Sequence, residues 1–398
     1  MHVGWDWASR NHDVTVIGDA GVIQARFAIG HDEAGLEGVL GELASLADPA
    51  DLPVAIERPD GIIVERLVVA GHPVVPVHPN AFHAARSRWG AGRAKSDPAD
   101  SYMLADYLRT DGHRLRRLRP LDPITRELQA LVRMRGDHVA ARTAATNQLH
   151  ALLEAHWPGA NAIFSRLGST IALAFLGDYP TPESAVRLGE ARLAMFCRRH
   201  SYRGGRTPTE LLQRLRTAAI APVGLDPIVL TELVQAQTTL IESALGSIAQ
   251  LDAAIGAQLL VHPKAELLQP LPRIGEINLA QIIAEIGPLL DRCDNADQAA
   301  AACGVAPITR QSGKTRNVQF RFSSNARARV ALTCFADNSR HSSAWAQQRY
   351  TSARRRGIRH PHAVRIVARA WLRVIWACWH NHTAYDPALH ASEAHHAA

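Results

Sequence analysis

The chain has 398 residues, 47% of them hydrophobic, and a formal net charge of +7 at pH 7. This length allows a sizeable buried core and predicts two or three domains. The five cysteines are odd in number and lack paired ligand spacing, which argues against a disulfide framework and a zinc site. We see no apolar run as long as a membrane span and no charged-then-apolar leader, so we expect a cytoplasmic protein with no membrane partner.

The first 120 residues predict an α/β layer domain. Residues 3–7 alternate like a strand, and the strand patterns at 12–17 and 21–29 are separated by turn residues, which indicates a hairpin. Further elements alternate in type, with helices over 32–47 and 60–70, strands over 53–57 and 72–78, and a helix that begins near Asp97. This order predicts that the first and fourth strands lie side by side at the centre of the sheet.

Residues 121–262 predict a helical, coiled-coil region, with an insertion near 157–225 and long helices over 123–156 and 227–260. The second long helix carries an apolar or small residue every three or four positions, which is typical of an antiparallel coiled coil or a partner helix. The positions of this predicted stripe are Val229, Leu233, Ala236, Leu240, Ala244, Ile248, Leu251, Ile255 and Leu259. We interpret the region as an arm or a dimerisation element.

Residues 263–385 predict a mainly helical third domain, followed by a disordered tail over 386–398. Its first part has the pattern of a helix-hairpin-helix, in which backbone amides at the Ile274–Gly275 turn can approach a DNA phosphate. Any helical hairpin needs a glycine, so a purely structural turn is the alternative. A loop over 308–320 and basic helices over about 325–382 follow. We expect the tryptophans of those helices in the core: Trp345, Trp371, Trp376 and Trp379.

Positive charge is concentrated near the carboxyl end of the chain. Residues 301–376 contain fifteen Arg or Lys and one acid, Asp337, giving this segment a charge of +14 and the remainder −7. Such a segment favours a polyphosphate partner such as nucleic acid, although a solvated basic surface is the alternative.

Four acidic residues in the first domain are candidate metal ligands. Asp6 and Glu57 lie within or at the end of apolar strands, where an unpaired charge is costly. Asp97 and Asp100 are three positions apart and share one helix face. Capping is the alternative for Asp97, because an Asp-Pro pair suits a helix start and recurs at Asp122 and at Asp226. A divalent cation is one of the few partners that stabilise several clustered carboxylates.

A candidate nucleophile lies in the basic segment. Residues 307–313, "PITRQSG", have the form P-x-x-x-x-S-G and contain Ser312. A Ser-Gly pair by itself is usually a turn. Its place, after the helix-hairpin-helix pattern and in a chain with four candidate metal ligands, favours a nucleophile that is activated by a base or a metal.

The order of the acids resembles the RuvC-like nuclease variant of the ribonuclease H fold, and the whole chain resembles the DEDD transposases and Piv-like site-specific DNA invertases of insertion-sequence family one-ten. The matching pieces are "GWDWAS", "AIERPDG", "KSDPADSYMLADYL", "LPRIGEINLAQIIAEIG" and "CGVAPITRQSG". They stand in the family's order and cover most of residues 1–120 and 265–335. One departure is Ser324-Asn325, where family members commonly have Gly-Asn.

This resemblance implies a RuvC-like domain, a coiled-coil arm and a C-terminal transposase domain. It implies Asp6, Glu57, Asp97 and Asp100 as metal ligands and Ser312 as the nucleophile. We expect Mg²⁺ as the cofactor, a covalent phosphoserine intermediate and a homo-oligomer, either dimer or tetramer. Implied partners are donor and target DNA and a structured bridge RNA that pairs with both.

The residues that we expect to contact nucleic acid are Lys95, Gly275, Arg310, Lys314, Arg316, Arg321 and Arg327. Two other functions fit the sequence less well. One is a metal-dependent, structure-selective nuclease of the Holliday-junction resolvase kind, in which water attacks and Ser312 is only a turn residue. The other is a basic DNA- or RNA-binding protein in which the acids are structural.

Overall fold

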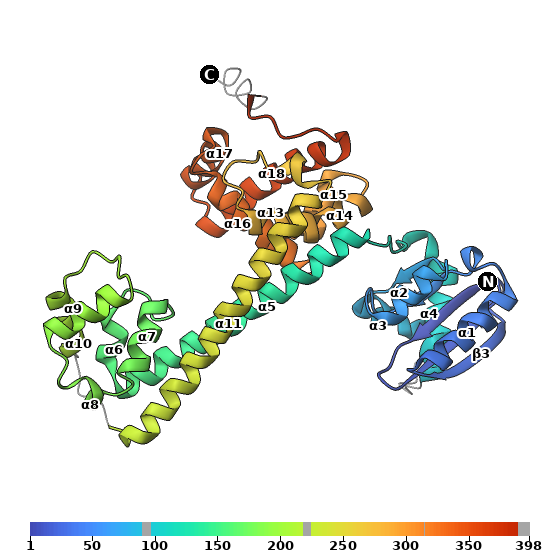
Figure 1. Cartoon of the computed structure of the whole chain (residues 1–398). Helices are drawn as coiled ribbons and strands as arrows, with labels where there is room; N and C mark the ends of the chain where they lie inside the picture. The colour runs from blue at the N-terminus through green and yellow to red at the C-terminus, as the bar shows by residue number, and fades with distance from the viewer. Residues whose placement is uncertain (90–96, 218–223, 314, 389–398) are drawn as a thin grey trace. The chain divides into compact units, whose positions relative to one another are not determined.

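The computed structural model describes residues 1–89, 97–217, 224–313 and 315–388 (Figure 1). At Asp97, Arg310 and Arg316 it describes the backbone only. The chain divides into two compact units, Met1–Pro120 and Leu121–Ala398, and each is described by itself. The predicted tail over 386–398 lies mostly outside the described residues.

The first unit contains a five-stranded sheet with the order β3-β2-β1-β4-β5. Its strands are β1 (His2–Asp6), β2 (Asn11–Ile17), β3 (Ile23–Gly30), β4 (Val54–Ile56) and β5 (Val74–Pro76). β1 pairs antiparallel with β2 and parallel with β4. The prediction that the first and fourth strands are neighbours is therefore confirmed.

Helices cover both faces of this sheet. The helices and short 3₁₀ turns are α1 (Glu33–Leu46), η1 (Pro49–Asp51), α2 (Ile62–Val69), α3 (Pro79–Ala85), η2 (Arg86–Trp89), α4 (Asp97–Asp111) and η3 (Gly112–Arg114). α1 and α2 share a core cluster with Val3 and Trp5 of β1. α3 and α4 contribute to a second cluster around Ala55 and Val75. The sequence prediction lacked α3, which lies between β5 and α4.

Gly4 allows α4 to lie directly against β1. A Cβ atom added at Gly4 would overlap the carbonyl oxygen of Ser101 and the backbone nitrogen of Ala105. Both are backbone atoms, so relief would require α4 as a whole to move. The absence of a side chain at Gly4 thus sets the distance between α4 and the sheet centre.

We expect Gly4→Ala to lower the free energy of unfolding by about 3 kcal/mol or more, the upper range for an overpacked core. Urea unfolding of the full chain, followed by tryptophan fluorescence, measures the change. Gly38→Ala is the matched control, because a Cβ atom at Gly38 meets no atom within 4 Å. It should raise stability by up to about 1 kcal/mol. Equal effects of the two substitutions would contradict the close approach at Gly4.

The second unit contains two long helices, α5 (Pro123–His156) and α11 (Pro227–Val261), which lie side by side (Figure 1). Asp122 and Asp226 accept hydrogen bonds at the two helix starts, as the Asp-Pro pattern predicted. Leu128, near the start of α5, shares a core cluster with Leu259, near the end of α11. The two helices are therefore antiparallel.

The predicted apolar stripe of α11 is only partly correct. Ala244, Ile248, Ile255 and Leu259 are buried, but the first half of the stripe is out of register by one position. The buried residues there are Leu230, Val234, Thr238 and Ile241, whereas Val229, Leu233 and Leu240 are exposed. The reason is that α11 has apolar residues on more than one face, so spacing alone does not select the face that packs.

α11 also bears on the expectation that the chain contains no membrane span. By length and composition alone this helix could cross a membrane, with a mean hydropathy of 1.4 over its most apolar window. This finding does not overturn the sequence expectation. One such helix is weak evidence, because core helices of soluble proteins meet the same criterion.

Residues 157–217, most of the insertion that the sequence predicted near 157–225, form a small helical layer. Its helices are α6 (Pro158–Ile163), α7 (Thr170–Asp178), α8 (Pro182–Ala185), α9 (Glu190–Arg199) and α10 (Pro208–Arg216). Phe164, Phe175 and Phe196 centre a core cluster that also includes Leu149 of α5 and Val234 of α11. The layer thus packs on one end of the long helix pair.

The other end of the helix pair joins the carboxyl-terminal helices in a second core cluster. The elements here are α12 (Ala265–Leu268), α13 (Glu276–Gln281), the π-helical η4 (Ile282–Ile286), α14 (Gly287–Arg292), α15 (Ala296–Ala302), α16 (Ala326–Ser339), α17 (Ala344–Arg355) and α18 (His360–Asn381). Trp371 and Trp379 are buried, and Trp345 and Trp376 pack against the same cluster, as predicted.

Two local predictions need correction. The expected loop over 308–320 is mostly a β-hairpin, formed by β6 (Ile308–Ser312) and β7 (Thr315–Gln319). Polar and basic residues hid this hairpin, because both faces are largely open to solvent. In the turn between α12 and α13, Arg273 has the left-handed backbone, with φ of 55°, whereas Gly275 is the extended N-cap of α13.

A buried carboxylate ties η4 to α5. Glu285 is only 2% exposed and accepts two hydrogen bonds from Arg133, at 2.7 and 3.2 Å. Asn325, the N-cap of α16, donates to the same carboxylate at 3.3 Å. We expect Arg133→Ala to lower the free energy of unfolding by about 3–5 kcal/mol, because it leaves a buried charge without its counter-ion.

Thermal and urea unfolding of the full chain measure this change. The control is Arg327→Ala, which removes a solvent-exposed ion pair with Asp137 and should cost at most about 1 kcal/mol. A loss of that size or smaller for Arg133→Ala would show that Glu285 does not depend on its partner.

Candidate functional site

Three acidic residues from neighbouring strands lie on one face at one end of the sheet. Asp6 ends β1 and is directly opposite Asp13 of β2. Glu57 follows β4, whose Ala55 pairs with Gly4. Residues two apart on a strand point to the same face, so Asp6 shares the face of Gly4, and Glu57 shares that of Ala55. Asp6, Asp13 and Glu57 are all half-buried and all have polar or electrostatic contacts.

α4 covers this same face. Its Ser101 hydroxyl lies 2.7 Å from the Thr15 hydroxyl, and both groups are buried. Thr15 is the cross-strand partner of Gly4. The helix therefore crosses β1 and β2 about two residues before the acids at the strand end.

The direction of α4 places its first turn near those acids. Near its end, Arg109 donates to the carbonyl of Asp19, in the turn that follows β2, at 3.2 Å. β2 is antiparallel to β1, so this turn lies beside the beginning of β1. The opposite end of α4, which contains Asp97 and Asp100, therefore lies toward Asp6. That the four acids bind one metal ion together stays a prediction.

The two acids of α4, Asp97 and Asp100, differ in what the structure shows of their side chains. Asp97 is the first residue of α4, and its side chain lies outside the described set. Asp100 is 4% exposed and forms an ion pair with Arg86 of η2. Within the described residues, no group of three or more His, Cys, Asp or Glu side chains is close enough to hold a metal ion.

These residues fit a divalent metal ion in their chemistry. Carboxylate oxygens are the ligands that Mg²⁺ prefers, and several gather on one side of the sheet end. The buried carboxylate of Asp100 already has a cationic partner, the Arg86 guanidinium. Metal binding by Asp100 would therefore require Arg86 to move away, with the ion taking over its charge.

Sequence reasoning missed Asp13 and Arg86. Strand alternation in "NHDVTVI" could have identified Asp13 as an acid opposite Asp6, since the hairpin was recognised. No sequence signal could have identified Arg86, because its pairing with Asp100 depends on the packing of η2 against α4.

Ser312 lies at the tip of the β6–β7 hairpin. It is exposed and pairs with Thr315 across a two-residue turn. Gly313 in that turn has φ of 53°, which non-glycine residues rarely adopt. The glycine after the serine is thus explained by the turn, and the turn presents the serine hydroxyl to solvent. The metal-ligand candidates belong to the other unit.

The residues predicted to contact nucleic acid divide into three groups. Lys95 and Lys314 lie outside the described residues, as do the side chains of Arg310 and Arg316. Arg321 donates to the carbonyl of Ala306 at 3.3 Å, and Arg327 pairs with Asp137. Gly275 begins α13, and a Cβ atom there would meet no atom within 4 Å. Its predicted phosphate contact stays a prediction.

Comparison with known proteins gives two family matches. Residues 3–158 match the model of a family described as Transposase, of the IS110 group with a DEDD motif. Residues 265–351 match a model described as Transposase IS116/IS110/IS902 family. The first match contains the four acids, and the second contains Ser312.

Similar proteins extend over nearly the whole chain. The "Mini-circle putative transposase for IS117" of Streptomyces coelicolor is 32% identical over 400 residues, covering 96% of this chain and 94% of the relative. The "Insertion element IS900 uncharacterized 42 kDa protein" of Mycobacterium paratuberculosis is 28% identical and covers 98% of each chain. The "Putative transposase y4uE" of Sinorhizobium fredii is 32% identical over 51% of this chain and 57% of its own length.

Proposed function

Since this chain belongs to the IS116/IS110/IS902 family of transposases, which cleave and transfer DNA, we propose that it recombines DNA through a phosphoserine intermediate on Ser312. The observation that carries this proposal is the exposed Ser312 at a hairpin tip, within the family-matched segment. A nucleophile must reach a phosphate that is part of a large duplex, and a protruding two-stranded tip suits that requirement.

The proposed step exchanges one phosphodiester for another. The Oγ of Ser312 forms a bond to phosphorus while the bond from phosphorus to the 3′-oxygen breaks. The hydroxyl proton of Ser312 passes to a base or to solvent, and the leaving 3′-oxygen takes up a proton. The 3′-hydroxyl can later attack the phosphoserine of the exchanged strand, so the reaction requires no ATP.

The carboxylates of Asp6, Glu57, Asp97 and Asp100 would hold the divalent ion, which we propose to be Mg²⁺. When bound, that ion would polarise the scissile phosphate and stabilise charge on the attacking and leaving oxygens. The sheet order β3-β2-β1-β4-β5 supports our assignment of the first unit as a RuvC-like, ribonuclease H-like domain. Ser312 belongs to the other unit.

The partners that we propose are donor and target DNA, a bridge RNA that pairs with both, and further copies of this chain. The concentration of arginine over residues 301–376 supports polyphosphate partners. Exposed apolar residues of α11, namely Val229, Leu233 and Leu240, support a homo-oligomer, dimer or tetramer, built on the α5–α11 arm. We propose a cytoplasmic location, where these partners are present.

The test is capture of a covalent complex. The full chain is incubated with Mg²⁺, DNA spanning the element junction and the transcribed flanking RNA, then separated under denaturing conditions. We expect a protein–DNA adduct whose modified peptide contains Ser312. Cleavage products without an adduct would instead support a structure-selective nuclease in which water attacks, since the Gly313 turn accounts for the Ser-Gly pair without catalysis.

A further inference from the structure

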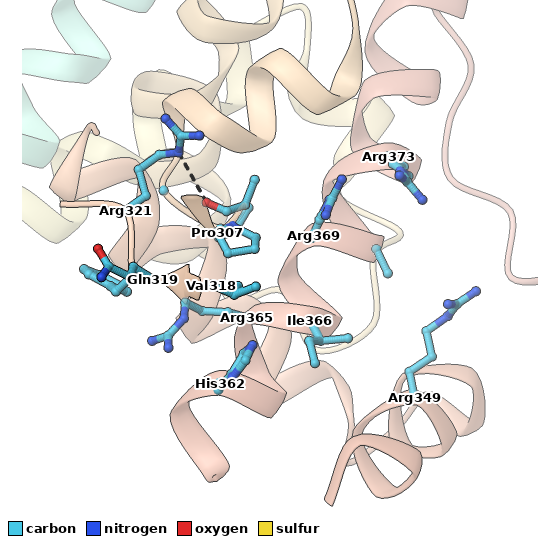
Figure 2. A pocket seen from close by; sticks show the side chains of 15 residues that line it. Pro307, Val318, Gln319, Arg321, Arg349, His362, Arg365, Ile366, Arg369 and Arg373 are labelled. Atoms are coloured by element: carbon cyan, nitrogen blue, oxygen red, sulfur yellow. Dashed lines mark hydrogen bonds between the residues drawn. The ribbon is translucent and has the colours of Figure 1, made fainter. Parts of the chain in front are cut away.

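A basic pocket lies at the base of the hairpin that carries Ser312 (Figure 2). It has a volume of about 400 Å³, within the range of small-molecule sites, and lies between the hairpin and α18. None of the described residues that line it is acidic. Its cationic or titratable lining residues are Arg321, Arg349, His362, Arg365, Arg369 and Arg373.

One wall of the pocket is a single face of α18. Arg365, Arg369 and Arg373 are spaced by four residues, which places them on successive turns of the same helix side, as Figure 2 shows. The opposite wall comes from Pro307, before β6, and from Val318 and Gln319 at the end of β7. The base of the hairpin therefore forms part of the pocket wall.

The positive charge in this pocket is only partly compensated. Arg369 and Arg373 share one carboxylate, that of the exposed Asp297, at 3.0 and 3.1 Å. The Nε of Arg369 is buried and has no hydrogen-bond partner among the residues that the structure describes. Such a donor indicates a missing acceptor, because buried N–H groups are normally satisfied.

Arg365 has still less compensation. It stacks on one ring, Phe320, at 4.9 Å, and Arg329 stacks on the same ring at 4.7 Å. No acidic side chain among the described residues forms an ion pair with Arg365. Burial and the charge of Arg329 lower the pKa of Arg365 from its ordinary value. Arg369, with its unsatisfied Nε, lines the pocket one helical turn from Arg365, so these two guanidinium groups form a ready site for an anion with several oxygens.

An aromatic side chain lies beside this anion site. Phe322 is 82% exposed, and its ring lies 4.9 Å from that of Phe320 in an edge-to-face arrangement. Uncompensated cations next to an exposed aromatic ring are the combination that binds single-stranded nucleic acid, through a phosphate and a stacked base.

We propose that this pocket binds a backbone phosphate of the same DNA strand that Ser312 cleaves, while Phe322 stacks on a neighbouring base. This inference rests on the proposed function of Ser312. β6 has five residues from base to tip, so the pocket lies about 14 Å from the serine at roughly 3.4 Å per residue. That separation matches about four stacked nucleotides at a rise of ~3.4 Å each. A strand that runs along the hairpin to its tip is therefore long enough to contact the pocket and Ser312 at once.

The test is binding of a fluorescent single-stranded DNA that carries the element's end, measured by anisotropy with EDTA present so that no cleavage occurs. We expect Arg365→Gln to weaken the binding of the full chain about tenfold and to reduce the slope of log affinity against log salt by about 0.7, the value for one phosphate on a single strand. Phe322→Ala should also weaken binding, with the salt slope unchanged.

Arg187→Gln is the matched control, because Arg187 is an exposed arginine of the same unit that lies outside the basic segment 301–376 and does not line the pocket. It should change affinity less than twofold. Arg365→Lys keeps the charge and should bind with intermediate affinity, which separates loss of the contact from misfolding. Ser312→Ala should bind like the unmodified chain, so the pocket and the nucleophile are tested independently.

A neutral methylphosphonate, moved one position at a time along the oligonucleotide, locates the contacted phosphate. We expect one position, about four nucleotides from the cleavage site, where the substitution weakens binding to the unmodified chain but not to Arg365→Gln. Equal losses for Arg187→Gln and Arg365→Gln would overturn the proposal. So would a loss by Arg365→Gln confined to an RNA of the same sequence, which would assign the pocket to the RNA instead.

Discussion

Ser312→Ala is expected to abolish the covalent protein–DNA complex and to reduce strand exchange by about a thousandfold or more, because the proposed reaction forms its bond to phosphorus through this hydroxyl. Ser312 is exposed at a hairpin tip, so its replacement should change the free energy of unfolding by no more than about 0.5 kcal/mol. Denaturing electrophoresis of reactions with end-labelled DNA measures the complex, and thermal unfolding confirms that the fold is intact.

The matched control is Thr315→Ala. Thr315 lies directly across the hairpin from Ser312 and also loses an exposed hydroxyl on substitution. We expect it to keep activity within about threefold, since it forms no bond to phosphorus. A covalent complex that persists in Ser312→Ala would refute the proposed nucleophile. An equal loss in Thr315→Ala would indicate that hairpin geometry, not the serine hydroxyl, limits the reaction.

Asp6→Asn, Glu57→Gln and Asp100→Asn are expected to reduce DNA cleavage by about a thousandfold and to weaken Mg²⁺ binding. Each change keeps the side-chain shape and removes the negative charge that a divalent ion requires. Mg²⁺ binding can be followed by calorimetry and by the rise in thermal unfolding temperature, both without DNA. These readouts separate loss of the metal from loss of later steps.

Asp100→Asn also releases Arg86, whose ion pair with Asp100 must open when a metal binds. The control is Asp106→Asn, which alters an acid on the same helix that pairs with Arg109 and accepts from Trp89. It should leave Mg²⁺ affinity and cleavage within about threefold of the unmodified chain. Unchanged Mg²⁺ affinity and activity in all three acid variants would support a nucleic-acid-binding protein whose acids are structural.

The strands of the first unit were predictable from local pattern. Alternation in residues 3–7 and 12–17, with turn residues between strands, identified β1 to β3, and the following alternation of helix and strand identified the parallel β4 and β5. Such patterns arise because each strand buries one face or both. The buried positions along the strand are therefore apolar residues. The same reasoning placed Asp6 beside Glu57.

The α11 stripe and the β6–β7 hairpin show where local pattern fails. Val229 and Leu230 are both apolar, and only packing against α5 and the helical layer α6–α10 decides that Leu230 is buried. The hairpin residues are mostly polar and exposed, so hydrophobic alternation is weak there. Strand pairing across the Gly313 turn, which needs a glycine with positive φ, defines the hairpin instead.

The sequence by itself determined the family, the acids at strand ends and the serine before a glycine, because chemistry and order along the chain are properties of the residues alone. Tertiary structure decided that α4 runs back along β1, that Arg86 holds Asp100, and that arginines of α18 face the base of the Ser312 hairpin. These pairings join residues from different elements. They depend on how helices and strands pack, and packing is set by shape and burial over the whole unit, which no local stretch records.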